Sequence, residues 1–224
     1  MIAKTLESEW LAIYDKFNRD VPYEYTVEAM GYRAVKNVAL FYLLSLDDEL
    51  YTEKAVLQFN HADNMTDKMG SLLALNQVDS PQFDALLDDF YQQYRAEPLV
   101  VNKWLTMQAL AQGDDTLAKV EKLMSHVAFS VKNPNNVYAL PGAFAQNVGC
   151  FHAKDGSGYR FIADQVLALD DINPQVAVRL VQPLVRWRQL DALRGDLMKE
   201  QLTRISEQPK LSSDMYEVVT KGLL

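Results

Sequence analysis

The sequence of 224 residues predicts an all-α protein built of antiparallel helix pairs, in an arrangement similar to armadillo or HEAT α-solenoids. Apolar residues recur at spacings of three and four along nearly the whole chain, which is the period of an amphipathic helix. Turn signals separate these periodic segments, and no segment alternates apolar and polar residues as a strand would. The helix pairs follow no strict repeat of about 34 or 40 residues, so any repeats are degenerate.

The segment 26–46 illustrates the helical pattern, with Thr26 as the expected N-cap. Its periodic apolar residues are Val27, Met30, Ala34, Val38, Phe41 and Leu44, while Glu28, Arg33, Lys36 and Asn37 lie elsewhere on the helix. The same period predicts further helices over residues 6–17, 49–59, 65–75, 82–94, 99–111, 117–130, 137–144, 159–169, 175–190, 193–205 and 213–223. Within these helices, Trp104 and Phe144 are expected to be core residues.

One segment, residues 146–158, breaks the helical pattern. It contains three glycines and few helix formers, so it is expected to be an ordered loop. A loop of this length in a compact domain is either a connector at the end of a helix pair or a functional segment.

Composition limits the class of protein. An apolar content of 49% and a charged content of 23% are those of an ordinary globular domain. The net charge of −8 argues against nucleic acid as a partner, and no apolar run approaches the roughly 20 residues that span a membrane. Cys150, the only cysteine, excludes a disulfide framework, and we expect it to be a buried structural residue. A reducing compartment is favoured, so we expect a cytoplasmic protein.

Catalytic and metal-binding motifs are missing from the chain. The three histidines, His61, His126 and His152, have no partner at the spacing of an H-E-x-x-H zinc site. There is no G-x-S-x-G nucleophile elbow and no glycine-rich phosphate loop. We therefore expect no catalytic residue, no metal and no cofactor within these 224 residues.

A polar stripe near the C-terminus is the one candidate binding feature. Gln175, Arg179, Gln182 and Arg186 are spaced to share one face of a helix that opens at Pro174. One interpretation is an exposed or salt-bridged face. The other is the lining of a cavity that receives an anionic group such as a peptide carboxylate, which guanidinium groups bind well.

Several short segments, in order, resemble the bacterial aminopeptidase N family. They are Lys36-Asn37-Val38-Ala39-Leu40 with Tyr42-Leu43, Phe59-Asn60-His61-Ala62-Asp63-Asn64-Met65-Thr66-Asp67, Lys103-Trp104-Leu105 with Gln108-Ala109, Asn133-Pro134-Asn135, Gly142-Ala143-Phe144, Phe151-His152-Ala153, Asp155-Gly156-Ser157-Gly158-Tyr159, Asn173-Pro174-Gln175-Val176-Ala177 and Met215-Tyr216-Glu217-Val218. Together they extend from about Tyr25 to the C-terminus. Asn102 precedes Lys103-Trp104 at a position where the corresponding segment of the family has aspartate. This difference puts in doubt any ionic role at that position.

The resemblance implies that residues 1–224 form a single C-terminal α-helical domain of a zinc metallo-aminopeptidase that removes N-terminal residues from peptides. The family's zinc and G-A-M-E-N motifs lie upstream of this region and are not in this sequence. The helical pattern begins almost at Met1, so we expect a piece of a longer protein.

The implied role is that of a lid, which closes a cavity over the catalytic domain of the same polypeptide and limits which peptides enter. By the same resemblance, Gln175 and Arg179 point into that cavity as substrate-binding residues. The alternative is a free-standing α-solenoid that binds a protein partner on its concave face.

Overall fold

The computed structural model describes residues 1–19, 21–78 and 80–224, and the regular elements in these ranges are all helical. The predicted all-α class is confirmed for this part of the chain. This part of the chain forms two compact units, Met1–Tyr94 and Arg95–Leu224. In the described residues, no helix is long and apolar enough to cross a bilayer.

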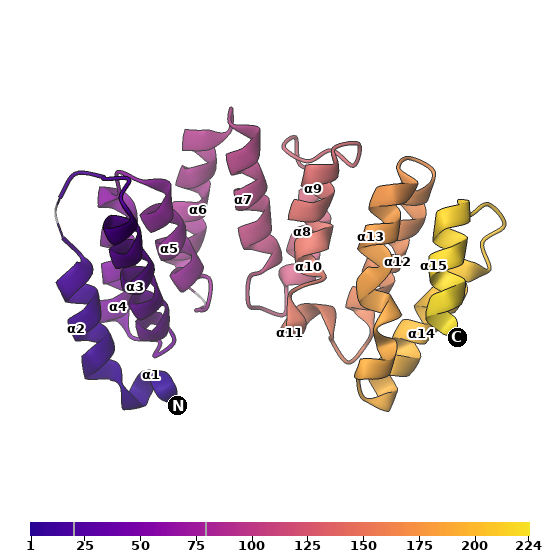
Figure 1. Cartoon of the computed structure of the whole chain (residues 1–224), viewed down its shortest axis with the longest axis horizontal. Helices are drawn as coiled ribbons and strands as arrows, with labels where there is room; N and C mark the ends of the chain where they lie inside the picture. Colours follow the sequence, from indigo (N-terminus) through magenta and orange to yellow (C-terminus); the bar gives the residue numbers. More distant parts are fainter. Residues whose placement is uncertain (20, 79) are drawn as a thin grey trace. The chain divides into compact units, whose positions relative to one another are not determined.

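In its described residues, the first unit consists of six helices in chain order (Figure 1). They are α1 (Ile2–Thr5), α2 (Glu7–Phe17), α3 (Val27–Leu44), α4 (Glu49–His61), α5 (Met65–Leu75) and α6 (Pro81–Tyr94). Side-chain oxygens cap α3, α4 and α5: the Thr26 hydroxyl accepts from the Ala29 amide at 3.2 Å, Asp48 Oδ1 accepts from the Leu50 amide at 2.8 Å, and Asn64 Oδ1 accepts from the Asp67 amide at 3.0 Å. The predicted N-cap at Thr26 is thus confirmed, and these bonds satisfy amides that lack a partner within the helix.

Helix α3 is the centre of this unit, because α2 and α5 both pack extensively against it. Its buried side carries Ala39, Leu40 and Leu43, which are inaccessible to solvent. The apolar stripe that predicted the helix lies mostly on the opposite side, where every member except Leu44 is exposed. The period therefore predicted the helix correctly, but it did not show which side of α3 is covered within this chain.

The second unit is also entirely helical in the described residues. Its elements are α7 (Pro98–Ala109), α8 (Thr116–Leu123), α9 (Pro134–Ala139), α10 (Pro141–Phe144), α11 (Val148–Phe151), α12 (Ser157–Asp170), α13 (Pro174–Val185), the 3₁₀ turn η1 (Trp187–Gln189), α14 (Ala192–Ser206) and α15 (Ser213–Leu223). Three residues, 171–173, reverse the chain between α12 and α13, which pack together as an antiparallel pair, and α13 also packs on α15 (Figure 1). Trp104 and Phe144 are buried, as predicted.

Three predicted helices divide or end well before their expected last residue, and a proline explains one of them. The helix predicted over 137–144 is divided into α9 and α10 at Pro141, which cannot donate a backbone hydrogen bond. The helix predicted over 175–190 ends at Val185, two residues after Pro183, and continues only as the turn η1. Arg186 is consequently a C-cap residue and not part of the helix.

The third shortened helix, predicted over 117–130, ends at Leu123. Beyond it, the His126 Nδ1 atom accepts from the Ala128 amide at 3.1 Å, and the Ser130 amide donates to Asn136 Oδ1 at 3.0 Å. These side-chain bonds replace the helical ladder and hold the chain in successive turns.

The prediction of a loop over 146–158 is only partly right, since α11 forms one helical turn inside it. Asn147 organises this turn: its side chain accepts from the Cys150 amide at 3.3 Å and donates to the Ala111 carbonyl at 2.8 Å. Gly156, with φ of 69°, then leads into α12 in a conformation that favours glycine. Cys150 is half-buried, not fully buried as predicted, because its thiol lies at the edge of the unit, 3.4 Å from the Gly113 carbonyl oxygen.

Candidate functional site

A groove of about 570 Å³ lies along α13 in the second unit. Apolar side chains such as Phe151, Leu180 and Met198 form part of its wall. Arg179 and Arg186 bring positive charge to it, and the described residues that line it include no aspartate or glutamate. A groove with this charge balance suits an anionic group attached to an apolar or peptide body.

Arg179 is held in the groove by an aromatic neighbour. Its Nη1 atom donates to the Tyr138 hydroxyl at 3.3 Å, and the guanidinium carbon lies 6.0 Å from the centroid of the same ring. Arg179 forms no ion pair with any carboxylate of residues 1–19, 21–78 and 80–224. The interpretation of a salt-bridged arginine is therefore not supported, and its other guanidinium donors have no hydrogen-bond partner among the described residues.

Only part of the predicted polar stripe lines this groove. Gln182 and Arg186 line it together with Arg179, whereas Gln175 lies outside it, exposed in the first turn of α13. Because α13 ends at Val185, Arg186 reaches the groove from the turn that follows and not from the helix face.

His152 also lines the groove, but it contributes little charge there. Burial, together with the nearby positive charge of Arg194, lowers the pKa of its imidazole, which favours the neutral form. Its Nδ1 atom is 2.8 Å from the Tyr159 hydroxyl, and its backbone carbonyl accepts from Arg194 Nε at 2.8 Å. These contacts tie α11 to α12 and α14 behind the groove, so His152 is a fixed wall residue.

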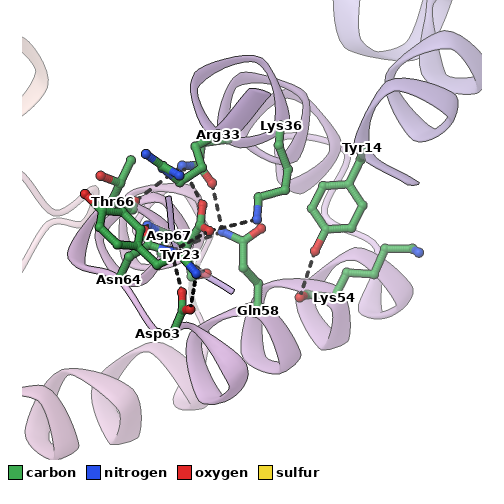
Figure 2. A network of polar contacts seen from close by, with 12 residues as sticks. Tyr14, Tyr23, Arg33, Lys36, Lys54, Gln58, Asp63, Asn64, Thr66 and Asp67 are labelled. Atoms are coloured by element: carbon green, nitrogen blue, oxygen red, sulfur yellow. Dashed lines mark hydrogen bonds and ion pairs between the residues drawn. The ribbon is translucent and has the colours of Figure 1, made fainter. Parts of the chain in front are cut away.

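The first unit contains a buried polar network that the sequence did not reveal (Figure 2). The Lys36 ammonium lies 3.0 Å from a carboxylate oxygen of Asp67, and both side chains are more than nine-tenths buried. The Gln58 side-chain amide donates to Asn37 Oδ1 at 2.8 Å and to the Asp67 carbonyl at 3.1 Å. The network joins α3, α4 and α5 around residues 64–67, which belong to one of the segments that resemble the aminopeptidase N family.

The edge of this network fixes the chain before α3 (Figure 2). Asp63 Oδ2 accepts from the Tyr23 amide at 2.8 Å. The hydrogen bond from Asn64 is the main cause of the lowered pKa of Asp63. The Arg33 guanidinium donates twice to the Glu24 carbonyl at 3.2 Å and covers the Tyr23 ring at 4.7 Å. All these groups face one another within the unit, so we interpret the network as a structural clamp.

The residues of this chain do not fit a zinc site. In the described ranges, no three side chains of histidine, cysteine, aspartate or glutamate converge as a set of metal ligands. A tetrahedral zinc centre needs at least three such ligands, so no chemical step in this chain is assigned to a metal.

With this geometry established, similarity to known proteins decides the family. The model of the family described as "Domain of unknown function (DUF3458_C) ARM repeats" matches residues 1–224. The chain belongs to this family. The description of ARM repeats confirms the predicted armadillo-like class of the fold.

Relatives extend the assignment. The chain is 36% identical to Aminopeptidase N of Haemophilus influenzae over 225 residues, which cover 99% of this chain and 25% of the relative. It is also 36% identical to Aminopeptidase N of Escherichia coli over 223 residues, which cover 99% of this chain and 26% of the relative. The predicted resemblance to bacterial aminopeptidase N is confirmed, and this family member spans about a quarter of the length of these relatives.

A solved structure agrees with the same assignment. The crystal structure of Legionella pneumophila aminopeptidase A in complex with aspartic acid matches 99% of this chain and 27% of its own. The TM-score is 0.90 and the sequence identity is 34%. The fold of this ARM-repeat chain is therefore that of a region within a larger aminopeptidase.

Proposed function

We propose that this chain is the C-terminal domain of a zinc-dependent aminopeptidase that removes N-terminal residues from peptides in the cytoplasm. The support is similarity over 99% of the chain to proteins named Aminopeptidase N, of which it spans only about a quarter. In this proposal the zinc and the catalytic residues belong to another domain of the same polypeptide, which is the partner of this one. The domain itself controls access of peptides and cleaves nothing.

The observation that supports a role in substrate binding is that the Arg179 guanidinium lies in the groove with no carboxylate of the described lining beside it. Its guanidinium stands over Tyr138 in a groove whose described lining has no carboxylate, so among the residues that the structure describes it has no anionic partner. A guanidinium in this position binds a carboxylate through two parallel hydrogen bonds. Arg186, which lines the same groove, adds a second positive charge.

The ligand that fits this arrangement is the carboxylate end of a short peptide. The apolar wall accommodates its last side chain, and Gln175, one turn before Arg179 at the surface, would contact longer peptides. These contacts are remote from bond cleavage, so they act on peptide binding and on which peptides enter.

The test is kinetic and uses the full-length enzyme. Arg179→Ala is expected to raise KM for a tripeptide at least about tenfold, because both charge-assisted hydrogen bonds to the carboxylate are lost, while kcat changes little. An alanyl arylamide has no peptide carboxylate and should keep its KM. Arg179→Lys, which retains the charge but not the guanidinium fork, should lie between wild type and Arg179→Ala.

The matched control is Arg160→Ala, because Arg160 is an exposed arginine of the same unit that lies outside the groove and donates to the Asp155 carbonyl. It should leave both substrates unaffected. An equal change of KM for the tripeptide and the arylamide in Arg179→Ala would overturn the substrate role.

A further inference from the structure

The most unusual surface of the chain lies on α3, a helix with apolar residues on two opposite sides. One side packs against α2 and α5, and the other is open to solvent. The open side is called here the outer face of α3, and it consists of Val27, Met30, Gly31, Ala34, Val38 and Phe41. Val27 is 89% exposed and Val38 50% exposed, in spite of their apolar side chains.

The outer face is continuous and uncharged. At 100° per residue its members fall within about 100° of the helix circumference, and from residue 27 to residue 41 they extend over about 21 Å. The charged residues of α3 point elsewhere and have partners: Glu28 accepts from the Tyr32 hydroxyl, Arg33 donates to the Glu24 carbonyl, and Lys36 pairs with Asp67. A helix that is apolar on opposite sides is typical of the interior of a protein.

Gly31 is a second feature of the outer face that is typical of a helix buried inside a protein. A Cβ atom added to it would meet no atom of the described chain within 4 Å. Glycine inside a helix lowers helix stability by about 1 kcal/mol relative to alanine, so its use there needs a reason outside this unit. A missing side chain next to Ala34 lets another backbone come close to the helix.

We propose that the outer face of α3 is the docking surface for an apolar segment of the same polypeptide, from the residues that lie outside the quarter matched here. The inference rests on the proposed function to the extent that this function requires a longer polypeptide. The relatives named Aminopeptidase N are about four times as long as this chain, and a polypeptide of that length has ample residues to cover the outer face. An attached segment has a high effective concentration, so modest apolar contact is sufficient to hold it. A second copy of this chain is disfavoured, because each copy carries a net charge of −8.

Hydroxyl-radical footprinting tests the proposal by comparing the 224-residue chain with the full-length polypeptide. In the shorter chain, Met30, Val38 and Phe41 should be modified readily, because all three are exposed. In the full-length polypeptide, Met30 should lose this reactivity and fall to the level of Met198, which is 1% exposed. Leu193, an exposed apolar residue of α14, is the control and should keep its reactivity.

A pair of variants tests whether contact with the outer face causes the protection. Gly31→Leu should leave the 224-residue chain folded, because the space around Gly31 is open. In the full-length polypeptide it should restore the modification of Met30. Leu193→Glu is the control and should leave Met30 protected. If Gly31→Leu prevents the full-length polypeptide from folding, while the 224-residue chain carrying it folds, the same contact is indicated.

Three outcomes would overturn the proposal. Met30 could be equally reactive in both proteins, or Leu193 could lose as much reactivity as Met30, which would indicate general shielding. The 224-residue chain could also form a dimer in sedimentation that protects Met30, which would identify a second copy as the occupant. The reactivity of Met30 is measured independently of enzyme activity. If the natural polypeptide were no longer than 224 residues, both the proposed function and this inference would be contradicted. If Met30 were reactive in a longer, active enzyme, only this inference would be contradicted.

Discussion

The ammonium group of Lys36 lies 3.0 Å from an oxygen of the Asp67 carboxylate, with both side chains more than nine-tenths buried. The pair joins α3 to the first turn of α5, and Asn64 Nδ2 donates to the same Asp67 oxygen at 3.0 Å. Two charges removed from water are stable only when they satisfy each other, so each depends on its partner.

Removing one member of this pair should be strongly destabilising. Asp67→Ala leaves the Lys36 ammonium buried without a counter-charge, and we expect the free energy of unfolding to fall by about 3–5 kcal/mol. Urea unfolding of the 224-residue chain measures this change. The double variant Lys36→Met/Asp67→Leu should recover most of the loss. Glu217→Ala, which removes an exposed ion pair with Lys221, is the control and should have almost no effect.

Truncating aromatic core residues of the second unit should lower the free energy of unfolding about as much as removing Asp67 does. Phe144 is fully buried and meets Phe161 edge-on at 5.4 Å between ring centroids, and Trp104 is nearly as buried. Phe144→Ala and Trp104→Ala should each lower the free energy of unfolding by about 3–5 kcal/mol. Tyr216→Ala is the exposed control and should stay within about 0.5 kcal/mol of wild type. A wild-type melting temperature in either core variant would show that the helix is packed differently.

The His152 imidazole should make stability depend on pH. Its pKa is lowered in the folded state, chiefly by burial, so between this value and the usual 6.5 the unfolded chain binds more protons than the folded one. Above that window both states hold neutral imidazole and His152 contributes nothing. Stability is therefore lost as the pH falls through the window.

The measurement is the free energy of unfolding of wild type and His152→Gln from about pH 7.5 to about pH 5.5, where the histidine titrates. Wild type should lose stability relative to the variant as the pH falls. Parallel curves for the two proteins would refute the prediction, since carboxylates that titrate at lower pH are common to both.

The 224-residue chain should bind no zinc stoichiometrically. The reason is that His61, His126 and His152 have no paired spacing in the sequence and no converging set of ligands in the described residues. Metal analysis after dialysis against zinc-containing and then metal-free buffer gives the answer. One tightly held zinc per chain would contradict both the prediction and the assignment of the metal to another domain.

Local signals in the sequence determined where the helices begin and what class of fold they build. Thr26 caps a helix through its side-chain oxygen, as its position before an apolar period predicted. Asn173 caps the helix that was expected to open at Pro174. The helix predicted over 137–144 is divided at Pro141, and that proline is itself the local signal for the break. The end of the helix predicted over 175–190 at Val185 has no such signal, because Pro183 lies inside α13. Capping and proline effects act within a few residues, so the sequence contains them directly.

Only the tertiary structure decided which side of each helix is covered and which polar groups meet. Both sides of α3 carry apolar residues at helical spacing, so the spacing alone does not show which side is buried. Packing against α2 and α5 buries the side that carries Leu40 and leaves the side of Val38 exposed. Lys36 and Asp67 are 31 positions apart, and Arg179 finds Tyr138 from 41 positions away, so no local pattern relates them. Such contacts depend on how whole helices dock, because burial and pairing are properties of the assembled core and not of the single helix.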